Sequence, residues 1–583
     1  MPTAENNLFQ PCVEVINNDG GEYGNNQTEK VHLIRKDDET NDGCWELPVF
    51  ESDDPEEELE KKPKEKKKTS NTGTFLHLIK GNIGTGILAM PMAISNFGLM
   101  AGIIGIIVLG IICIYCMQLL IFSNKIAVVK KKEHMRQETQ SQSVAESGYS
   151  TIGISSTNEP DESAGDYGSG TSSDGASTSH QVTQQSEVPS NSENKKLETD
   201  ITLDYANTAY EAFKYGPRIF QPLAPFMKGL VNALLVATQF GFCCVYFLFV
   251  GQSLHEVSLN MKVFTTFNTK TIMAIILPFM VVLNFIPNLD TLTSVSTTAI
   301  GLQVVGLLMM LMYFVNGTFS DNFIPYIAPF TKWPLFFGTA LFSFEGIGVV
   351  LPLENEMKRK RSFKTIVYLG MTVVVCLYLL IGICGYLKYG MDVKPSITFN
   401  LPVGCFSEVI RLLFALAIFL SYPLQMYVAF TFTLPYLKSK LICSSCNRWG
   451  GLVIEGIIRT IIVSFTCALA IGVPMLDLVI SFIGSFASSG LAIIIPAFIH
   501  AVTISKYRIR YKKLLIGIDI CLSIFGVFGL IVGSITSISE MIHKNSTEVA
   551  LSLASYNELM YSEMPGAISI LNSKNGSCCT LYH

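Results

Sequence analysis

Long apolar runs separated by short polar segments are the main pattern along the 583-residue chain. Each run approaches the roughly 20 residues that an α-helix needs to cross a hydrocarbon core of about 30 Å. The runs predict eleven membrane-spanning helices, which begin near residues 76, 99, 229, 271, 295, 335, 365, 406, 452, 475 and 514. The pattern therefore predicts an all-α polytopic membrane protein.

Composition supports this class, because 49% of the residues are hydrophobic and only 15% are charged. The charges lie mostly in tails and loops, so the net charge of -5 says little about partners. No signal-peptide pattern occurs in the polar N-terminal segment, and we expect the first span to direct insertion. Cysteines inside apolar runs are expected to be small packing residues rather than disulfides: Cys113, Cys116, Cys243, Cys244, Cys376 and Cys467.

Polar segments divide the chain into predicted regions. These are a disordered cytosolic tail (1–74), spans one and two (75–132), a disordered cytosolic loop (133–200), spans three to eleven (201–540) and an extracellular or luminal tail (541–583). Residues 29–34 fit an acidic di-leucine sorting pattern, and residues 210–213 fit a tyrosine-based one. Cytosolic signalling or sorting proteins could therefore bind these segments, although a solvated linker explains both long segments as well.

Basic residues indicate the orientation of the chain. The short loops after spans six, eight and ten hold 13 lysines and arginines, against 5 in the loops after spans three, five and seven. Short cytosolic loops carry the excess of positive charge. We therefore expect a cytosolic N-terminus and an extracellular or luminal C-terminus. Three glycosylation sequons, at Asn316, Asn545 and Asn575, fall on the predicted outer side.

The first span contains a stretch that suits a helix poorly. It reads "FLHLIKGNIGTGILAMP" from Phe75 and places glycines at 81, 84 and 86. Glycine lowers helix propensity and permits close approach of the backbone to a ligand. Close helix packing through small residues is the alternative explanation.

Span six repeats the feature, which favours a break in both spans. It reads "FSFEGIGVVLPLENEM" from Phe342, with Glu345 beside two glycines at membrane depth. A carboxyl group there is costly and marks a functional position by default. Spans one and six are corresponding members of two five-span halves of opposite orientation. Broken helices at matching positions of inverted halves indicate the midplane site of a transporter.

Helix ends give this expected site its chemistry. A half-helix beginning near Gly84, Thr85 and Gly86 would present unpaired N–H groups to a carboxylate. Unwound carbonyl groups around the breaks would suit an ammonium group. An amino acid zwitterion carries both charges. The predicted substrate-binding residues at the breaks are Gly81, Ile83, Gly84, Thr85, Gly86, Ser343, Phe344, Glu345 and Gly346.

These two stretches resemble the signature segments of the proton-coupled amino acid transporter family, solute carrier family 36, which belongs to the amino acid/auxin permeases of the amino acid, polyamine and organocation superfamily. The resemblance covers residues 75 to about 540. It implies a LeuT-like fold of two inverted five-span repeats plus one extra span. It also implies transport of small neutral amino acids such as glycine, alanine and proline, and residence at the plasma membrane or on late endosomes and lysosomes. For some members it implies a part in nutrient signalling.

Two residues are candidates for proton coupling. The resemblance implies that His77, at the start of span one, is the proton-responsive residue. An imidazole suits this role because its ordinary pKa is about 6.5, although a hydrogen-bonded histidine at a helix edge explains His77 equally well. Glu345 is the rival, since a buried carboxyl group can bind and release a proton near neutrality.

The side walls of the site are chosen by analogy with this fold class. Tyr246 of span three and Ser421 or Tyr422 of span eight are the candidates, although an aromatic residue in a span more often serves packing. Lys80 is expected to be structural. The charged residues of spans eight and nine are expected to pair as Glu408 with Arg411 and Glu455 with Arg459, outside the site.

Four functions remain open at this point. A proton-coupled or facilitative carrier of small amino acids, working by alternating access, is favoured. A sodium-coupled carrier of the same fold and an amino acid sensor with little flux are the alternatives. A membrane enzyme is disfavoured, because the sequence shows no HExxH pair, clustered metal ligands or nucleophile elbow. The expected partners are the amino acid, protons and the lipid membrane. We expect no nucleic acid and no metal or other cofactor, with the proton gradient as driving force.

Overall fold

The computed structural model describes residues 69–151, 201–262, 266–286, 289–316, 324–441 and 448–563. Within these ranges the chain is almost entirely helical, and a parallel bridge joins Thr69 to Met357. Nine helical segments of the described residues are long and apolar enough to cross a membrane. Two shorter apolar helices, Thr85–Phe97 and Thr269–Leu283, coincide with predicted spans one and four. The predicted all-α polytopic class is confirmed.

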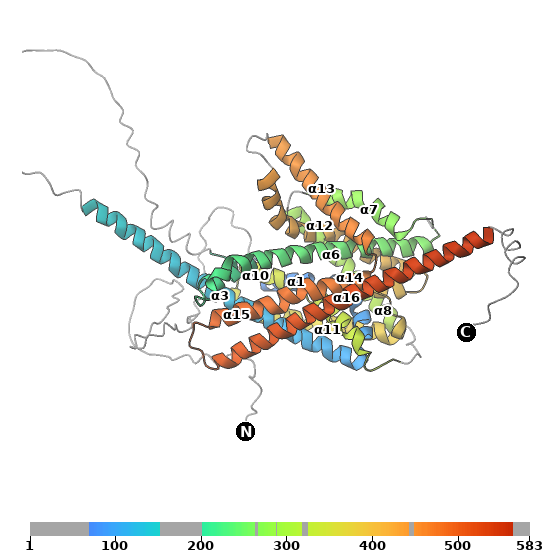
Figure 1. Ribbon diagram of the computed structural model, residues 1–583, viewed down its shortest axis with the longest axis horizontal. Helices are drawn as coiled ribbons and strands as arrows, with labels where there is room; N and C mark the ends of the chain where they lie inside the picture. The colour runs from blue at the N-terminus through green and yellow to red at the C-terminus, as the bar shows by residue number, and fades with distance from the viewer. Residues whose placement is uncertain are drawn as a thin grey trace, which may run out of the picture.

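The first part of the chain forms the first broken span and a long second helix. The elements are α1 (Asn71–Asn82), α2 (Thr85–Phe97) and α3 (Leu99–Thr151). Figure 1 shows the end of α3 projecting beyond the other helices. The disordered loop predicted from residue 133 therefore begins inside a helix, because the charged sequence after the apolar run continues the helix into a polar environment.

A short amphipathic helix precedes the third span. The elements are α5 (Tyr205–Lys214), η1 (Gln221–Leu223), α6 (Ala224–Asn260), α7 (Thr269–Leu283) and α8 (Leu289–Val315). Asp204 caps α5 by accepting a bond from the Asn207 backbone N–H at 2.7 Å. Phe213 of α5 is fully buried. The tyrosine-based sorting pattern at 210–213 is therefore part of a packed helix and is not presented as an extended peptide.

The second half begins with another broken span. Its elements are η2 (Phe330–Lys332), α9 (Trp333–Ser343), α10 (Ile347–Glu356), η3 (Lys360–Ser362), α11 (Phe363–Tyr389), η4 (Gly390–Asp392), η5 (Ile397–Asn400) and α12 (Cys405–Leu441).

The remaining spans include a π-helical stretch. They are α13 (Arg448–Gly472), α14 (Leu476–Ile483), η6 (Gly484–Ser488), η7 (Gly490–Ile494), α15 (Ile495–Ile504) and α16 (Lys512–Glu563). The helix of α16 continues past residue 540, where we expected the last span to give way to a tail. A π-helical turn inside a helix is frequently found at a functional position.

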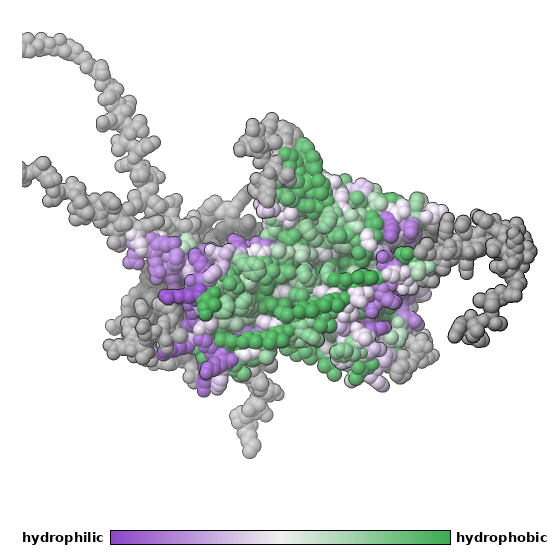
Figure 2. Space-filling model, viewed as in Figure 1, coloured by the Kyte–Doolittle hydropathy of each residue, from purple (hydrophilic) through white to green (hydrophobic). Residues whose placement is uncertain are grey.

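The surface matches a membrane environment. Figure 2 shows hydrophobic residues over the middle of the molecule and hydrophilic residues gathered toward its two ends. Large apolar side chains of α16 remain exposed, with Ile524 at 65% and Phe528 at 61%. Exposed apolar belts of this kind are stable where lipid is the solvent. Of the cysteines expected to be buried, Cys376 is exposed, while the other five are buried.

Backbone contacts fix the directions of the two broken spans. Thr69, before α1, donates its N–H to the Glu356 carbonyl at 2.8 Å, so the start of α1 meets the end of α10. At the other end, the Ala328 N–H donates to the Phe97 carbonyl at 3.0 Å, so the end of α2 meets the segment before α9. The two broken spans therefore run in opposite directions. We call the end that holds Thr69 the basic end, because Lys358 and Lys360 follow there, and the opposite end the far end.

Candidate substrate and coupling site

The first span breaks where its glycines cluster. Helix α1 ends at Asn82, and α2 begins at Thr85 after Ile83 and Gly84. Gly84 has φ −137° and ψ −145°, an extended conformation that interrupts the helix. The first N–H groups of α2 have no acceptor within the preceding turn, as at any helix start. The predicted break and its position are confirmed.

The second break lies at the predicted place in span six. Helix α9 ends at Ser343 and α10 begins at Ile347, with Phe344, Glu345 and Gly346 between them. The Gly346 N–H donates to the Phe344 carbonyl at 2.8 Å, which closes a tight turn. This turn leaves the last carbonyl groups of α9 free to accept other donors.

The two breaks pack directly against each other. A Cβ atom added to Gly86 would lie 2.4 Å from the Ser343 Oγ, and one added to Gly346 would lie 2.5 Å from the Asn82 Nδ2. Both separations are far below van der Waals contact, so glycine is required at both positions. The structure thus brings together the two segments that the sequence predicted as one site.

A tyrosine of α11, which the sequence analysis missed, joins the breaks. The Tyr378 hydroxyl lies 2.6 Å from the Asn82 carbonyl oxygen and 2.5 Å from the Ser343 carbonyl oxygen. Its side chain is fully buried, and its ring packs on Phe344 with centroids 5.1 Å apart. The single hydroxyl proton is therefore shared between the carbonyls that end α1 and α9. Sequence reasoning had no signal for this residue, because one tyrosine in an apolar run resembles ordinary packing.

Two further side chains line the first break. The Gln303 Nε2 of α8 donates to the Gly84 carbonyl at 3.2 Å. The Tyr246 hydroxyl of α6 would lie 3.6 Å from a Cβ atom on Gly84. Tyr246 was predicted as a wall, whereas Gln303 was not singled out because its partner is a backbone atom remote in sequence.

The predicted wall residues of span eight make hydrogen bonds that do not involve the breaks. Tyr422 is fully buried, and its hydroxyl pairs with the Thr466 hydroxyl of α13 at 2.9 Å. Ser421 donates to the Ala417 carbonyl of its own helix at 2.8 Å. The structure therefore does not bring Tyr422 to the breaks, and it leaves the Ser421 hydroxyl tied to α12.

Unpartnered polar atoms mark the first break as a place for a ligand. Among the described residues, the buried Asn82 Oδ1 and Thr85 Oγ1 have no hydrogen-bond partner. A buried polar atom without a partner costs about 1–3 kcal/mol, so such atoms call for a ligand or water. These two atoms flank Gly84, where the carbonyl oxygens and the α2 N–H groups meet.

Glu345 faces a different part of the bundle from Tyr246. It interacts with Ser488 of the π-helical η6 and lies within electrostatic reach of Cys113 of α3. Its Oε2 atom and the Ser488 Oγ are buried without a geometrically adequate hydrogen bond in the described part of the chain. Glu345 is thus part of the break, but its carboxyl group points toward spans two and ten.

His77 is separate from the breaks. It lies one and a half turns before the end of α1, half-buried, with Lys80 and Glu356 as its charged neighbours. Glu356 ends α10, so His77 lies between the two half-helices at the basic end. The pairs Glu408–Arg411 and Glu455–Arg459 form as predicted, the latter at 2.8 Å, and neither contacts the breaks.

Exposure of the breaks is one-sided. Gly81 is exposed and Val349 is 39% exposed, and a Cβ atom on Gly81 would lie 3.1 Å from the Val349 side chain. Beyond the breaks, Gly86 to Pro91 of α2 and Gly338 to Ser343 of α9 are buried. The exposed residues beside the breaks therefore belong to α1 and α10, whereas the facing parts of α2 and α9 are buried.

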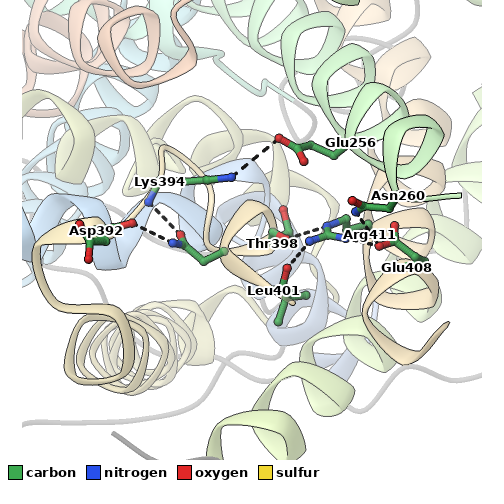
Figure 3. Close-up of polar contacts among 9 residues, drawn as sticks. Glu256, Asn260, Asp392, Lys394, Thr398, Leu401, Glu408 and Arg411 are labelled. Carbon is green, nitrogen blue, oxygen red and sulfur yellow. Dashed lines mark hydrogen bonds and ion pairs between the residues drawn. The ribbon is translucent and has the colours of Figure 1, made fainter. Parts of the chain in front are cut away.

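A strap of residues 393–401 closes the far end. Ile397 and Thr398 are fully buried, and the Arg411 Nε of α12 donates to the Thr398 carbonyl at 3.0 Å (Figure 3). Arg411 also binds the Leu401 carbonyl and the Glu408 carboxylate, which accepts a 2.8 Å bond from Asn260 of α6. One buried guanidinium thus ties the strap to two spans.

The fold and the opposed breaks define an integral membrane protein built like a secondary transporter. Residues 67–153 and 197–539 match the family described as "Transmembrane amino acid transporter protein", and the chain belongs to this family.

Two curated relatives agree with this family. The proton-coupled amino acid transporter-like protein pathetic of Drosophila melanogaster is 26% identical over 484 residues, which cover 81% of this chain and 86% of the relative. The vacuolar amino acid transporter 4 of Saccharomyces cerevisiae is 28% identical over 344 residues, which cover 54% of this chain and 48% of the relative. A solved structure of the nucleobase–cation symporter Mhp1 is 13% identical to this chain and has a TM-score of 0.41. The match covers 82% of this chain and 94% of Mhp1, and a likeness this distant supports no conclusion about function.

Proposed function

We propose that this protein carries small neutral amino acids, such as glycine, alanine and proline, across its membrane by alternating access, driven by a proton gradient. The observation that carries the proposal is the contact between the two breaks. Gly86 packs against Ser343 and Gly346 packs against Asn82, so the ends of the two broken spans meet within contact distance. A site built at this junction favours substrates with small side chains.

Recognition of the zwitterion follows from the atoms around Gly84. The N–H groups that begin α2 and the partial positive charge of the helix end favour a carboxylate. The Asn82 Oδ1 and Thr85 Oγ1, both without a partner in the described chain, favour an ammonium group as acceptors. One amino acid backbone satisfies both sets.

Coupling is assigned to His77, near the start of α1, and to Glu345, within the second break. His77 lies between α1 and α10 at the basic end, where a change of its charge acts on two half-helices. Glu345 forms part of the second break. Protonation drives the cycle only if it changes the relative stability of the two access states. His77 belongs to α1 and Glu345 adjoins α10, and these two half-helices hold the exposed residues beside the breaks.

Orientation and compartment complete the proposal. The loops at the basic end carry Lys358, Arg359, Lys360 and Arg361, and lysine and arginine are retained on the cytosolic side. The basic end is therefore assigned to the cytosol and the far end to the outside or lumen. With this orientation, the exposed residues beside the breaks, Gly81 and Val349, lie on the cytosolic side. A plasma membrane or a late endosomal and lysosomal membrane supplies the required proton gradient.

Uptake into proteoliposomes tests this function. Labelled alanine, glycine and proline are supplied with pH and sodium varied separately. Saturable uptake that rises with an inward proton gradient and ignores sodium is the expected result. Sodium dependence would instead identify the sodium-coupled carrier, and saturable binding without flux would identify the sensor.

Single substitutions test the coupling residues. We expect His77→Asn and Glu345→Gln to flatten the pH dependence of uptake while substrate exchange continues, because exchange needs no net proton movement. His543→Gln, an exposed histidine of α16, is the matched control. Unchanged pH dependence in both coupling variants contradicts the assignment but leaves carriage itself intact.

A further inference from the structure

A buried histidine–aspartate pair lies outside the breaks. The His500 Nδ1 of α15 and the Asp519 Oδ2 of α16 are 2.7 Å apart, with side-chain exposures of 7% and 0%. The Asp519 Oδ1 is buried and has no partner among the described residues. Neither the substrate site nor the coupling residues assigned above use this pair.

The pair is surrounded by apolar side chains and by groups that are uncharged at neutral pH. The Phe122 ring of α3 packs edge-on against His500 with centroids 5.4 Å apart. Tyr115 and Cys116 of α3 are the titratable groups near Asp519, and the charged group that acts on the Asp519 carboxylate is His500. Among the described residues, no second cation acts on the carboxylate of the pair.

This environment makes the pair sensitive to a single proton. With a protonated imidazole the pair is neutral overall and hydrogen-bonded. Without that proton, a carboxylate charge remains at 0% exposure with one oxygen unpartnered, which is costly in an apolar interior. Loss of the proton therefore favours a rearrangement that admits water between α15 and α16. The closed packing described here, with the two side chains 2.7 Å apart, suits the protonated form of the pair.

The position of the pair connects it to the second break. Ser488, which interacts with Glu345, lies 12 residues before His500 in the same span, about 18 Å at 1.5 Å per residue. On α3, Cys113 lies within electrostatic reach of Glu345, and Cys116, about one turn on, within reach of Asp519. Span ten and α3 thus both run from the break to the pair.

The pair is also close to the basic end. His500 precedes the last residue of α15, Ile504, by four positions, or about 6 Å along the helix. Lys512, which begins α16, donates to the Ser505 carbonyl and holds the two helices together there. Water from this end needs to penetrate little more than one helical turn to reach the imidazole.

We propose that the His500–Asp519 pair is a proton-binding site of the transport cycle, at which the proton that enters with the substrate is held before its release at the basic end. The imidazole nitrogen gains the proton as an N–H bond and loses it to water when α15 and α16 separate. This inference rests on the proposed proton-driven carriage.

The test uses the full-length protein in proteoliposomes. Alanine uptake and internal acidification are followed at external pH of about 5.5 and about 7.5, on either side of the ordinary histidine pKa of about 6.5. In His500→Gln and Asp519→Asn we expect the ratio of uptake at the two pH values to fall to about 1 and the accompanying acidification to disappear. Alanine counterflow, which needs no net proton movement, should continue. His543→Gln and Glu540→Gln, exposed on α16, are the matched controls.

The outcomes separate this inference from the proposed function. A wild-type protein whose uptake ignores pH overturns the proposed coupling. A pH-dependent wild type whose two variants keep the wild-type ratio and acidification overturns the proton site alone. If neither variant is monodisperse after purification, backbone hydrogen exchange of wild-type residues 499–523 at the two pH values decides. A lower protection of these backbone N–H groups from exchange at the higher pH supports the proton site. Equal protection factors at the two pH values overturn it.

Discussion

The Tyr378 hydroxyl holds the carbonyl ends of two half-helices with one proton. Its contacts with the Asn82 and Ser343 carbonyls, at 2.6 and 2.5 Å, link the two broken spans through one side chain. A hydroxyl that serves two acceptors at once exchanges easily between them. This residue therefore fixes the junction while leaving each half-helix able to move.

Removal of this hydroxyl should weaken transport more than folding. Tyr378→Phe leaves both carbonyls without their donor, at a cost of about 1–3 kcal/mol for a buried group. We expect alanine uptake to fall about tenfold, the equivalent of roughly 1.4 kcal/mol, with the ring still packed on Phe344. Tyr386→Phe, whose hydroxyl in the same helix contacts the Met391 sulfur, is the control. Equal losses in the two variants would show that the junction does not depend on Tyr378.

Glycine at the breaks is required by space rather than by backbone angle. Gly86→Ala would place a methyl group 2.4 Å from the Ser343 Oγ and 2.8 Å from the Ser343 Cα. Overpacking of this kind costs about 1–3 kcal/mol. We expect Gly86→Ala to lower the melting temperature in detergent and to abolish uptake. Gly301→Ala, with nothing within 4 Å of the added atom, should change neither. A stable, active Gly86→Ala protein would mean that the breaks do not pack as described.

At the scale of the elements, the far-end strap depends on one buried charge. Arg411 is 2% exposed and binds the Thr398 and Leu401 carbonyls as well as Glu408. Loss of one partner of a buried ion pair costs about 3–5 kcal/mol, because the other charge is left uncompensated. Arg411→Met should therefore release the strap, and a cysteine placed at Thr398 should then react with a thiol reagent applied at the far end.

A second ion pair of the strap supplies the control. Lys394 and Glu256 are 3.9 Å apart, and their side chains are 49% and 33% exposed. Exposed pairs contribute about 0–1 kcal/mol. Lys394→Met should leave the engineered cysteine unreactive. Equal reactivity in both backgrounds would show that Arg411 does not hold the strap.

The positions of the helix breaks could be predicted from the sequence, whereas the contacts between them could not. Glycines and a lone glutamate inside apolar runs have a local signature, because they oppose helix formation where they stand. Gln303 and Tyr378 act on backbone carbonyls 219 and 296 residues away, and their own neighbours in sequence carry no sign of this. Tyr422 shows the converse, since its place in span eight suggested the site but its hydroxyl belongs to Thr466.

At the scale of the whole molecule, orientation is testable with one glycosylation site. Asn545 is exposed on α16, near the C-terminal end of the candidate span Lys512–Thr547. Asn316 directly follows α8 and is exposed as well, while Asn575 and the di-leucine pattern at 29–34 lie outside the described residues. Outward sequons are the ones that a glycosyltransferase reaches.

We expect glycosidase treatment to shift the protein on a gel and Asn545→Gln to reduce that shift. If the gel shift remains in Asn545→Gln but disappears in Asn316→Gln, the glycan is attached to Asn316. The assigned orientation then stays the same. A cysteine introduced in the tail before Thr69 should not react with a reagent applied outside intact cells. If it does react, the assigned orientation is reversed.

The bridge between Thr69 and Met357 has a mechanical consequence. Its two hydrogen bonds, at 2.8 and 3.0 Å, join the chain before α1 to the chain after α10 through main-chain atoms alone. The half-helices α1 and α10 at the basic end are therefore linked through the main chain. A movement of the segment before α1 acts on both of them. Ordinary side-chain replacements leave this linkage in place, whereas proline at position 69, which has no N–H, removes one of the two hydrogen bonds.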